Sequence, residues 1–461
     1  MNMNRKASYN ISRIVFLALL AICVIFHSIK FFSILALTLF VLYLLLTLYH
    51  YPIFYIKYFY IVFVLLATVL SCFLIEFSHF YLRELRINSS YVGALPLLLL
   101  SYFIMVETII LYDKKSHNIV EFNSIRQRSV YELNIFIYIS YLTLIILTLC
   151  MLKVFPHPSF LLHLERADYA KYYGVTGFLG RLATNIPRLL VFPFFLIVAS
   201  RGKKRLIGIS CLVLASLYYL WIGNKFGAFF QIMYIFLIVL SGYLTTKVSS
   251  KRLLKTIKKI GILFAILIAT TLVVQSITYN GVIKDYFLSR IASEGQIWWS
   301  VFGKTGGSIH LNEIADELQS LELGKSNISD NIGSHYGIYK MMYYCAPTSV
   351  INSILSAGYR YTESGFACAF YYLGYWGPIL YALIMGVVFA FLINKLSKAI
   401  NEHKVFRIYI YIRFLLYATT AFSMFIFTPF WGVKNIALYI YLMVSHEKNY
   451  TLNINRIKVK I

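Results

Sequence analysis

The sequence predicts an all-α polytopic membrane protein with about twelve transmembrane helices. Hydrophobic residues make up 60% of the 461 residues, and the mean hydropathy is +0.72, a profile that soluble globular domains do not have. The apolar residues are also gathered into blocks of about 20 residues, the length with which an α-helix crosses the hydrocarbon core of a bilayer. We therefore expect a single integral membrane domain over residues 1–461.

The apolar blocks follow one another along most of the chain. Arg5, Lys6 and Arg13 precede the first block and no small-residue cleavage site follows it, which favours a retained first helix over a signal peptide. We expect the spans at residues 14–27, 31–49, 58–77, 91–112, 134–152, 182–200, 206–222, 226–244, 260–277, 374–393, 408–428 and 430–444.

The distribution of charge predicts the orientation of these spans. With the N-terminus inside, 26 of the 43 Lys and Arg residues fall in the inside connections, and most of the acidic residues fall on the other side. RGKKR at 201–205 and KRLLKTIKK at 251–259 lie directly beside spans, where this bias is most informative. We therefore predict both termini in the cytoplasm. The net charge of +25 then reflects topology and not nucleic-acid binding.

Two enlarged loops fall on the opposite side, at residues 153–181 and 279–374. Function-bearing residues concentrate on loops that a rigid scaffold holds, so we expect recognition or chemistry there. Within the longer loop, residues 308–324 are predicted to form an amphipathic helix that begins at Ser308 and ends at Gly324, with leucine and isoleucine at spacings of three and four. Its acidic residues lie off that stripe, so we expect the helix to lie on the membrane face of the scaffold and expect no catalytic role for these acids.

Five motifs occur in a fixed order between residues 160 and 380. They are ERADYAKYYG, GNKFGAFF (223–230), SRIASEGQIWW (289–299), YGIYKMMYYCAP (336–347) and GYRYTESGFACAFYYLGYWGPI (358–379). In this order they resemble the Wzy-type O-antigen polymerases, which polymerise oligosaccharide repeat units carried on an undecaprenyl lipid.

The resemblance implies a GT-C-like helical fold and a glycosyl transfer that needs no metal or cofactor, at the periplasmic face of the bacterial inner membrane. It implies that undecaprenyl-diphosphate-linked oligosaccharide serves as both donor and acceptor. Membrane lipids and a chain-length regulator are the further partners it implies, and basic residues of the two large loops would handle the diphosphates.

The chemistry of such a donor calls for arginine. A lipid diphosphate leaving group gains negative charge in the transition state, and without a metal that charge is met by basic side chains. Arginine suits this role because its planar guanidinium binds two oxygens and stays charged. We predict Arg166 and Arg290 as the catalytic arginines, since each lies in a large loop close to the end of a span. Each has the alternative interpretation of a headgroup contact or a structural ion pair.

An acceptor hydroxyl needs a base within hydrogen-bonding distance. Glu294 and His335 are the predicted candidates, with His310 and Glu363 as alternatives in the same loop. Glu294 follows Arg290 by four residues, so on a helix the two share a face and Glu294 serves equally well to neutralise the arginine.

Other side chains are predicted to contact the substrate. Aromatic rings can stack on sugars, and basic side chains can bind phosphate, although each type also occurs as an interface anchor or a lipid contact. The predicted substrate-binding residues are Tyr169, Lys225, Trp298, Trp299, Lys340, Arg360 and Tyr361.

Charged residues inside spans form a separate group. Glu107 and Arg413 lie within predicted spans, where an ionisable group is costly and indicates either function or a buried partner. The six cysteines contain no CxxC pair and no metal-binding spacing, so we expect neither a metal site nor a disulfide.

Two alternative functions stay open. A flippase for the same lipid-linked unit has a similar number of spans, but it is expected to have short loops and charges within the spans. An O-antigen ligase shares the arginine-based handling of the diphosphate, and a histidine base in the large loop resembles the ligase pattern.

Overall fold

The computed structural model describes most of the chain. The described residues are 2–79, 81–117, 130–162, 169, 172–173, 182–183, 185–223, 226–243, 258, 262, 266, 291–314, 336–356, 361, 365–447, 451–454 and 457–460. Within them the fold is helical, apart from two short antiparallel hairpins, β1 (Tyr81–Leu82) with β2 (Ile87–Asn88) and β3 (Thr451–Ile454) with β4 (Ile457–Lys460).

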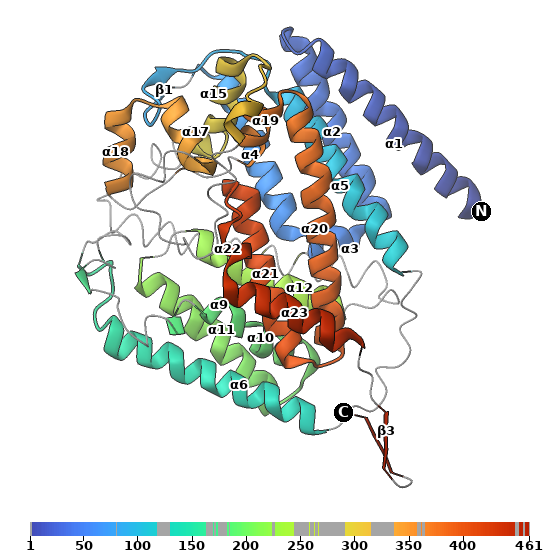
Figure 1. Ribbon diagram of the computed structural model, residues 1–461, viewed down its shortest axis with the longest axis vertical. Helices are drawn as coiled ribbons and strands as arrows, with labels where there is room; N and C mark the ends of the chain where they lie inside the picture. The colour runs from blue at the N-terminus through green and yellow to red at the C-terminus, as the bar shows by residue number, and fades with distance from the viewer. Residues whose placement is uncertain are drawn as a thin grey trace.

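One group of helices runs along the long axis of the molecule (Figure 1). Helix α5 is at its centre and packs against α1, α2, α4 and α20. Its leucine-rich first half is almost wholly buried, because neighbouring helices surround it on all sides. The group consists of α1 (Asn2–Ile25), α2 (Lys30–His50), α3 (Pro52–Lys57), α4 (Phe59–Phe77), α5 (Leu95–His117) and α20 (Trp376–Asn401).

A second group lies across the first at the lower end of the view in Figure 1. Helices α6, α10 and α11 pack on one another, and α12 joins them to α20. The group consists of α6 (Val130–Leu149), a π-helical turn η1 (Cys150–Val154), α9 (Ile186–Leu189), α10 (Val191–Ala199), α11 (Lys203–Trp221) and α12 (Phe226–Tyr243). Helix α21 (Val405–Met424) contacts both groups, through α20 and α9, and is followed by α22 (Thr428–Trp431) and α23 (Val433–Glu447).

Seven of the described helices are long and apolar enough to cross a membrane, which indicates a membrane protein. They are Lys30–His50, Phe59–Phe77, Leu95–Lys114, Asn134–Val154, Lys203–Trp221, Trp376–Asn401 and Val405–Met424. Four shorter apolar helices cover Ile11–Ile25, Ile186–Ala199, Gly227–Ser241 and Val433–Val444. Eleven of the twelve predicted spans therefore coincide with an apolar helix, and the span predicted at 260–277 lies almost wholly outside the described residues.

Short helices form a cap over one end of the first group (Figure 1). We use the name cap for the described residues 81–94, 291–314, 336–356, 361 and 365–375. Its elements are the β1–β2 hairpin, α15 (Gln296–Thr305), the 3₁₀ turn η2 (Leu311–Glu313), α17 (Gly337–Cys345), α18 (Thr348–Ser356) and α19 (Gly365–Leu373). Helix α15 packs on α4, α17 and α19, so residues of the long predicted loop close over the ends of the spans.

A tight turn joins the cap to the scaffold between α19 and α20. Gly374 adopts a left-handed conformation with φ of +57°, which favours glycine. A side chain at Gly377 would collide with the backbone carbonyl of Ala369, so α20 can start directly beneath α19. These glycines serve close packing, as glycine does between membrane helices.

The start of the predicted amphipathic helix differs from expectation. Thr305 and Gly306 end α15, and the chain then forms only the single 3₁₀ turn at Leu311–Glu313, preceded by His310 and not by Ser308. Leu311 is 50% exposed, so the described part of its apolar stripe is not packed on the protein. The rest of this segment lies outside the described residues.

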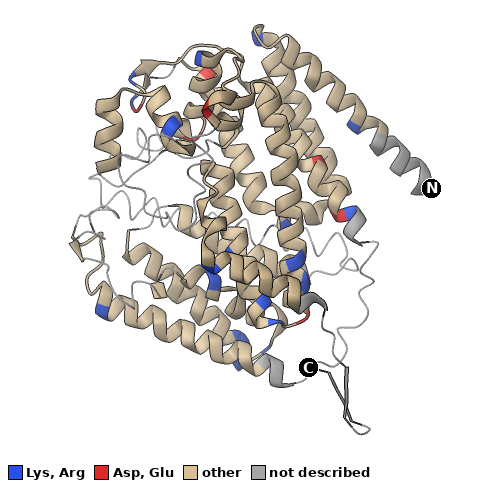
Figure 2. Ribbon diagram, in the orientation of Figure 1, with Lys and Arg blue, Asp and Glu red and all other residues tan. Residues whose placement is uncertain are grey.

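Contacts at each end of the molecule join residues that are far apart in the sequence. At the cap end, the Tyr91 hydroxyl donates to the His27 carbonyl oxygen at 2.6 Å. At the opposite end, the His403 ring packs edge-on against Phe136 and Phe195, with ring centroids 5.5 and 5.1 Å apart. In the ribbon of Figure 2, positions of Asp and Glu occur beside positions of Lys and Arg in the cap, whereas Lys and Arg predominate at the opposite end.

Candidate functional site

Polar side chains from three separate segments meet in the cap. Lys340 on α17 places its Nζ 2.7 Å from Oε2 of Glu313, and the hydroxyl of Tyr371 on α19 donates to the same oxygen at 2.9 Å. The Lys340 Nζ also lies 5.6 Å from the centroid of the Tyr371 ring, within cation–π range. The hydrogen bond from Lys340 lowers the pKa of the Glu313 carboxyl below its usual value. The predicted phosphate ligand Lys340 is therefore already paired with a carboxylate.

His310 packs against the same tyrosine. Its ring stacks on Tyr371 with centroids 4.3 Å apart and planes 7° apart, and its Nδ1 lies 3.0 Å from the Tyr371 carbonyl oxygen. A carbonyl oxygen only accepts, so this bond assigns the proton of the neutral ring to Nδ1 and leaves the lone pair on Nε2. His310 is half-buried, and the arrangement suits an oriented base.

Lys304 fixes the C-terminal end of α17 against α15. Its Nζ donates to the carbonyl oxygens of Tyr344 and Cys345 at 3.1 and 3.0 Å, where the helix leaves carbonyls without intrahelical partners. Burial raises the pKa of the Cys345 thiol to about 11, so this thiol stays protonated at neutral pH and is a poor nucleophile. All six cysteines are buried and free.

Trp298 and Trp299 lie inside the cap. Trp298 is fully buried and its indole N–H donates to the Ala94 carbonyl oxygen at 3.1 Å, while Trp299 is 4% exposed and donates to the Ser90 carbonyl oxygen at 2.9 Å. The two indoles thus join α15 to the segment that leads into α5. Their burial does not support the predicted stacking on sugars, and it assigns them to packing.

Tyr361 and Tyr169 are also buried with their hydroxyls bonded to backbone. Tyr361 donates to the Glu84 carbonyl oxygen at 3.0 Å, which attaches it to the β1–β2 hairpin. Tyr169 donates to the His157 carbonyl oxygen and stacks on Phe155 with ring centroids 5.4 Å apart. Both tyrosines are placed for packing within the protein, so their predicted role in substrate binding stays a prediction.

Of the remaining predicted site residues, the structure describes Glu294. Glu294 follows a helical turn at residues 291–293 and is half-buried in the cap. Arg166, Lys225, Arg290, His335 and Arg360 lie outside the described residues.

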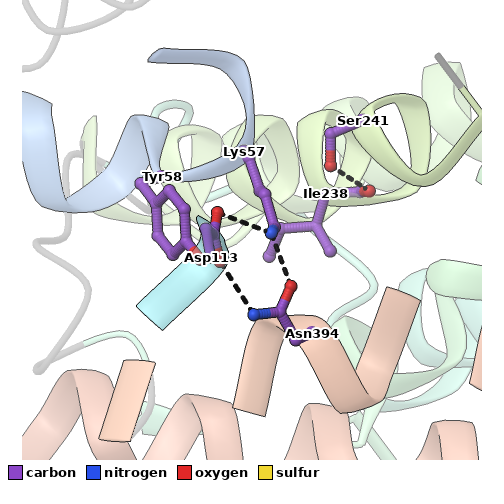
Figure 3. Close-up of polar contacts among 6 residues, drawn as sticks. All are labelled: Lys57, Tyr58, Asp113, Ile238, Ser241 and Asn394. Carbon is purple, nitrogen blue, oxygen red and sulfur yellow. Dashed lines mark hydrogen bonds and ion pairs between the residues drawn. The ribbon is translucent and has the colours of Figure 1, made fainter. Parts of the chain in front are cut away.

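A second polar cluster lies at the end of the first helix group away from the cap (Figures 1 and 3). The Lys57 Nζ lies 2.8 Å from Oδ2 of Asp113 and donates to Oδ1 of Asn394 at 2.6 Å. The second carboxylate oxygen of Asp113 accepts bonds from the Tyr58 hydroxyl at 2.8 Å and from Nδ2 of Asn394 at 2.7 Å. The cluster joins α3, α5 and α20, and the Lys57 side chain is 8% exposed.

Glu107, predicted to carry either function or a buried partner, has a partner. Its carboxylate forms an ion pair with Arg13 of α1 and accepts a hydrogen bond from the Tyr43 hydroxyl of α2 at 2.8 Å. Glu107 therefore links three helices of the first group and does not meet Arg413.

Arg413 instead shares a tyrosine ring with a second arginine, Arg188, which the sequence alone did not indicate. Arg188 of α9 and Arg413 of α21 place their guanidinium carbons 5.9 and 5.3 Å from the centroid of the Tyr417 ring. The sequence offered one signal for the α21 side of this cluster. Tyr409, Arg413 and Tyr417 recur at four-residue spacing and therefore share one face of α21.

The comparisons with known proteins give one match. Residues 332–440 match a family of unknown function, DUF6418, and this range covers α17 to α21 and most of α23. No curated protein and no solved structure matches the chain. Among the described residues, no three His, Cys, Asp or Glu side chains are grouped as a metal site requires.

Proposed function

We propose that this protein polymerises undecaprenyl-diphosphate-linked oligosaccharide repeat units into O-antigen or a related surface polysaccharide. The observation that carries the proposal is the cap. Three of the five motifs that resemble the Wzy-type polymerases, at 289–299, 336–347 and 358–379, supply its helices α15, α17 and α19, which pack on one another at one end of the apolar bundle. A site at the end of a membrane bundle is where a lipid-anchored donor presents its sugar.

The reaction is a substitution at the anomeric carbon of the donor. The bond from this carbon to the diphosphate oxygen breaks, and the acceptor hydroxyl oxygen forms the new glycosidic bond. The hydroxyl proton passes to a base, and the undecaprenyl diphosphate departs with the bonding electrons. His310 is a candidate base in the described cap, because its Nε2 carries the lone pair while Tyr371 orients the ring.

The cellular setting belongs to the same proposal. The chain is placed in the bacterial inner membrane with a GT-C-like fold, the cap in the periplasm and both termini in the cytoplasm. The N-terminal end of α1 and the β3–β4 hairpin both lie away from the cap, which is compatible with this placement (Figure 1). The proposed partners are the lipid-linked oligosaccharide, the surrounding lipids and a chain-length regulator.

A flippase is the second candidate, and a specific observation favours it. Charged groups occur within the helix bundle as well as in the cap, namely the Arg13–Glu107 pair, Arg188 and Arg413. Charges within spans are typical of substrate and ion pathways.

The deciding experiment is the sugar-length ladder of lipopolysaccharide from a deletion strain and from the same strain complemented with the gene. A polymerase deletion leaves lipid A-core that carries a single repeat unit, because flipping and ligation still operate. Bare lipid A-core would contradict the polymerase assignment. Polymer retained on undecaprenyl diphosphate would then identify a ligase, and its absence would identify a flippase.

A further inference from the structure

Two arginines, Arg188 of α9 and Arg413 of α21, lie within cation–π range of one tyrosine ring. Arg413 is 8% exposed, and Arg188 is half-buried. Arg188 bonds to neutral groups, donating from Nη1 to Oδ1 of Asn185 at 2.5 Å and to the Tyr409 hydroxyl at 3.4 Å. Arg413 has the Tyr417 ring beside it. Within the described part of the chain, neither guanidinium has an acidic partner, and the Nε atoms of both are buried without a hydrogen-bond acceptor.

This arrangement is costly unless an anion completes it. A buried charge loses its hydration, and a cation–π contact recovers only part of that loss. Here two like charges also share one ring, so each disfavours the other. The buried Lys57 and the half-buried Arg13 of the same bundle each have a carboxylate partner, Asp113 and Glu107 respectively. The arginine pair therefore points to a ligand that carries negative charge.

The chemistry of the pair indicates the class of anion. Each guanidinium presents a planar set of N–H donors that matches two oxygens of a phosphate, and two such groups suit a phosphate or diphosphate better than a single carboxylate. Arg413 belongs to a helix long and apolar enough to span the membrane. An anion that reaches an arginine of such a helix is most readily carried by a lipid.

We propose that Arg188 and Arg413 bind the phosphate or diphosphate group of a lipid between α9 and α21. Asn185 and Tyr409 position Arg188, and the Tyr417 ring lies within cation–π range of both guanidinium groups. The identification of this lipid with the undecaprenyl-diphosphate substrate rests on the proposed function. The anion site itself does not.

The test measures ligand-induced stabilisation of the purified full-length protein in detergent. The probes are geranylgeranyl diphosphate, inorganic pyrophosphate and phosphatidylglycerol, and the variants are Arg188→Gln and Arg413→Gln. Arg205→Gln is the matched control, because Arg205 is an exposed basic residue of α11. Arg413→Lys keeps the charge but removes the planar donor set, so it reports on binding even where the Gln variant folds poorly.

We expect geranylgeranyl diphosphate to raise the unfolding temperature of the wild type and of Arg205→Gln, as a ligand specific for the folded state does. Its half-saturating concentration should rise roughly tenfold or more in each arginine variant, the loss expected for a charge-assisted hydrogen bond. Equal stabilisation in all variants, or none in the wild type by any probe, would overturn the site.

The other two probes identify the ligand. An arginine-dependent effect of inorganic pyrophosphate alone would overturn a lipid as the ligand and leave a site for the free anion. An arginine-dependent effect of phosphatidylglycerol equal to that of the diphosphate would support a general lipid-phosphate site. Because the assay involves no polymerisation, its outcome is separate from the sugar-length ladder.

Discussion

Lys57 and Arg413 are both buried cations, yet their surroundings differ. Lys57 lies against a carboxylate and an amide, and every bond of Asp113 in that cluster is made within the protein (Figure 3). Arg413 lies against the ring of Tyr417 and beside Arg188, a second cation that bonds only to neutral groups. The first cation is satisfied by the fold, whereas the second carries positive charge that the described fold does not neutralise.

The comparison distinguishes charged side chains that the fold itself pairs from charged side chains that are available to bind a ligand. Burying an ion pair brings little net stability, because desolvation offsets the attraction, but removing one partner leaves a costly isolated charge. An arginine that pairs with no carboxylate cannot be destabilised by the loss of such a partner. The Lys340–Glu313 pair of the cap is an intermediate case, since the Glu313 side chain is 35% exposed and solvent screens the interaction. These contrasts lead to four predictions, from the largest expected effect to the smallest.

Asp113→Ala is expected to lower the free energy of unfolding by about 3–5 kcal/mol, because Lys57 then keeps its charge without a carboxylate. The measurement is a reversible SDS titration of the purified protein in mixed micelles. The double variant Lys57→Met with Asp113→Leu is the control and should recover most of the loss. A single variant within about 1 kcal/mol of wild type would remove the distinction between the two cations.

Trp298→Phe is expected to lower the free energy of unfolding by about 1–2 kcal/mol, because the Ala94 carbonyl loses its donor while the apolar ring is retained. The same titration measures this. Polymer length on the sugar ladder should be unchanged, since the indole is buried. Loss of polymer in a variant of normal abundance would restore the predicted stacking role of this residue.

Arg413→Met is expected to change the free energy of unfolding of the ligand-free protein by less than about 1 kcal/mol, because the removed desolvation cost offsets the lost cation–π contact. The SDS titration again provides the measurement. A loss as large as that of Asp113→Ala would mean that Arg413 has a structural counter-ion, and the comparison with Lys57 would fail.

Acidification is expected to loosen the cap through Glu313. The pKa of this carboxyl is lower in the folded protein than its usual value of 4.5, so its stabilising contribution is complete above that pH and is lost as the pH falls through the folded pKa. Tryptophan fluorescence between neutral pH and about pH 3 would follow this change, because Trp298 and Trp299 lie in the cap. Lys340→Met should flatten the acid response, and an unaltered profile in that variant would assign the response to another group.

The sequence by itself determined where the apolar helices lie. Hydrophobicity is a local property, and a run of about 20 apolar residues is sufficient for a helix to be stable in a bilayer whatever surrounds it. That is why eleven predicted spans coincide with apolar helices.

Only the tertiary structure decided which polar residues meet. Glu107 pairs with Arg13 and not with Arg413, and Asp113 finds Lys57 and Asn394 on helices far apart in the chain. The tryptophan pair has the sequence features of a sugar platform or an interface anchor, yet both indoles are buried. Such partnerships depend on how each helix is rotated and on which neighbour packs beside it, and hydrophobicity constrains neither.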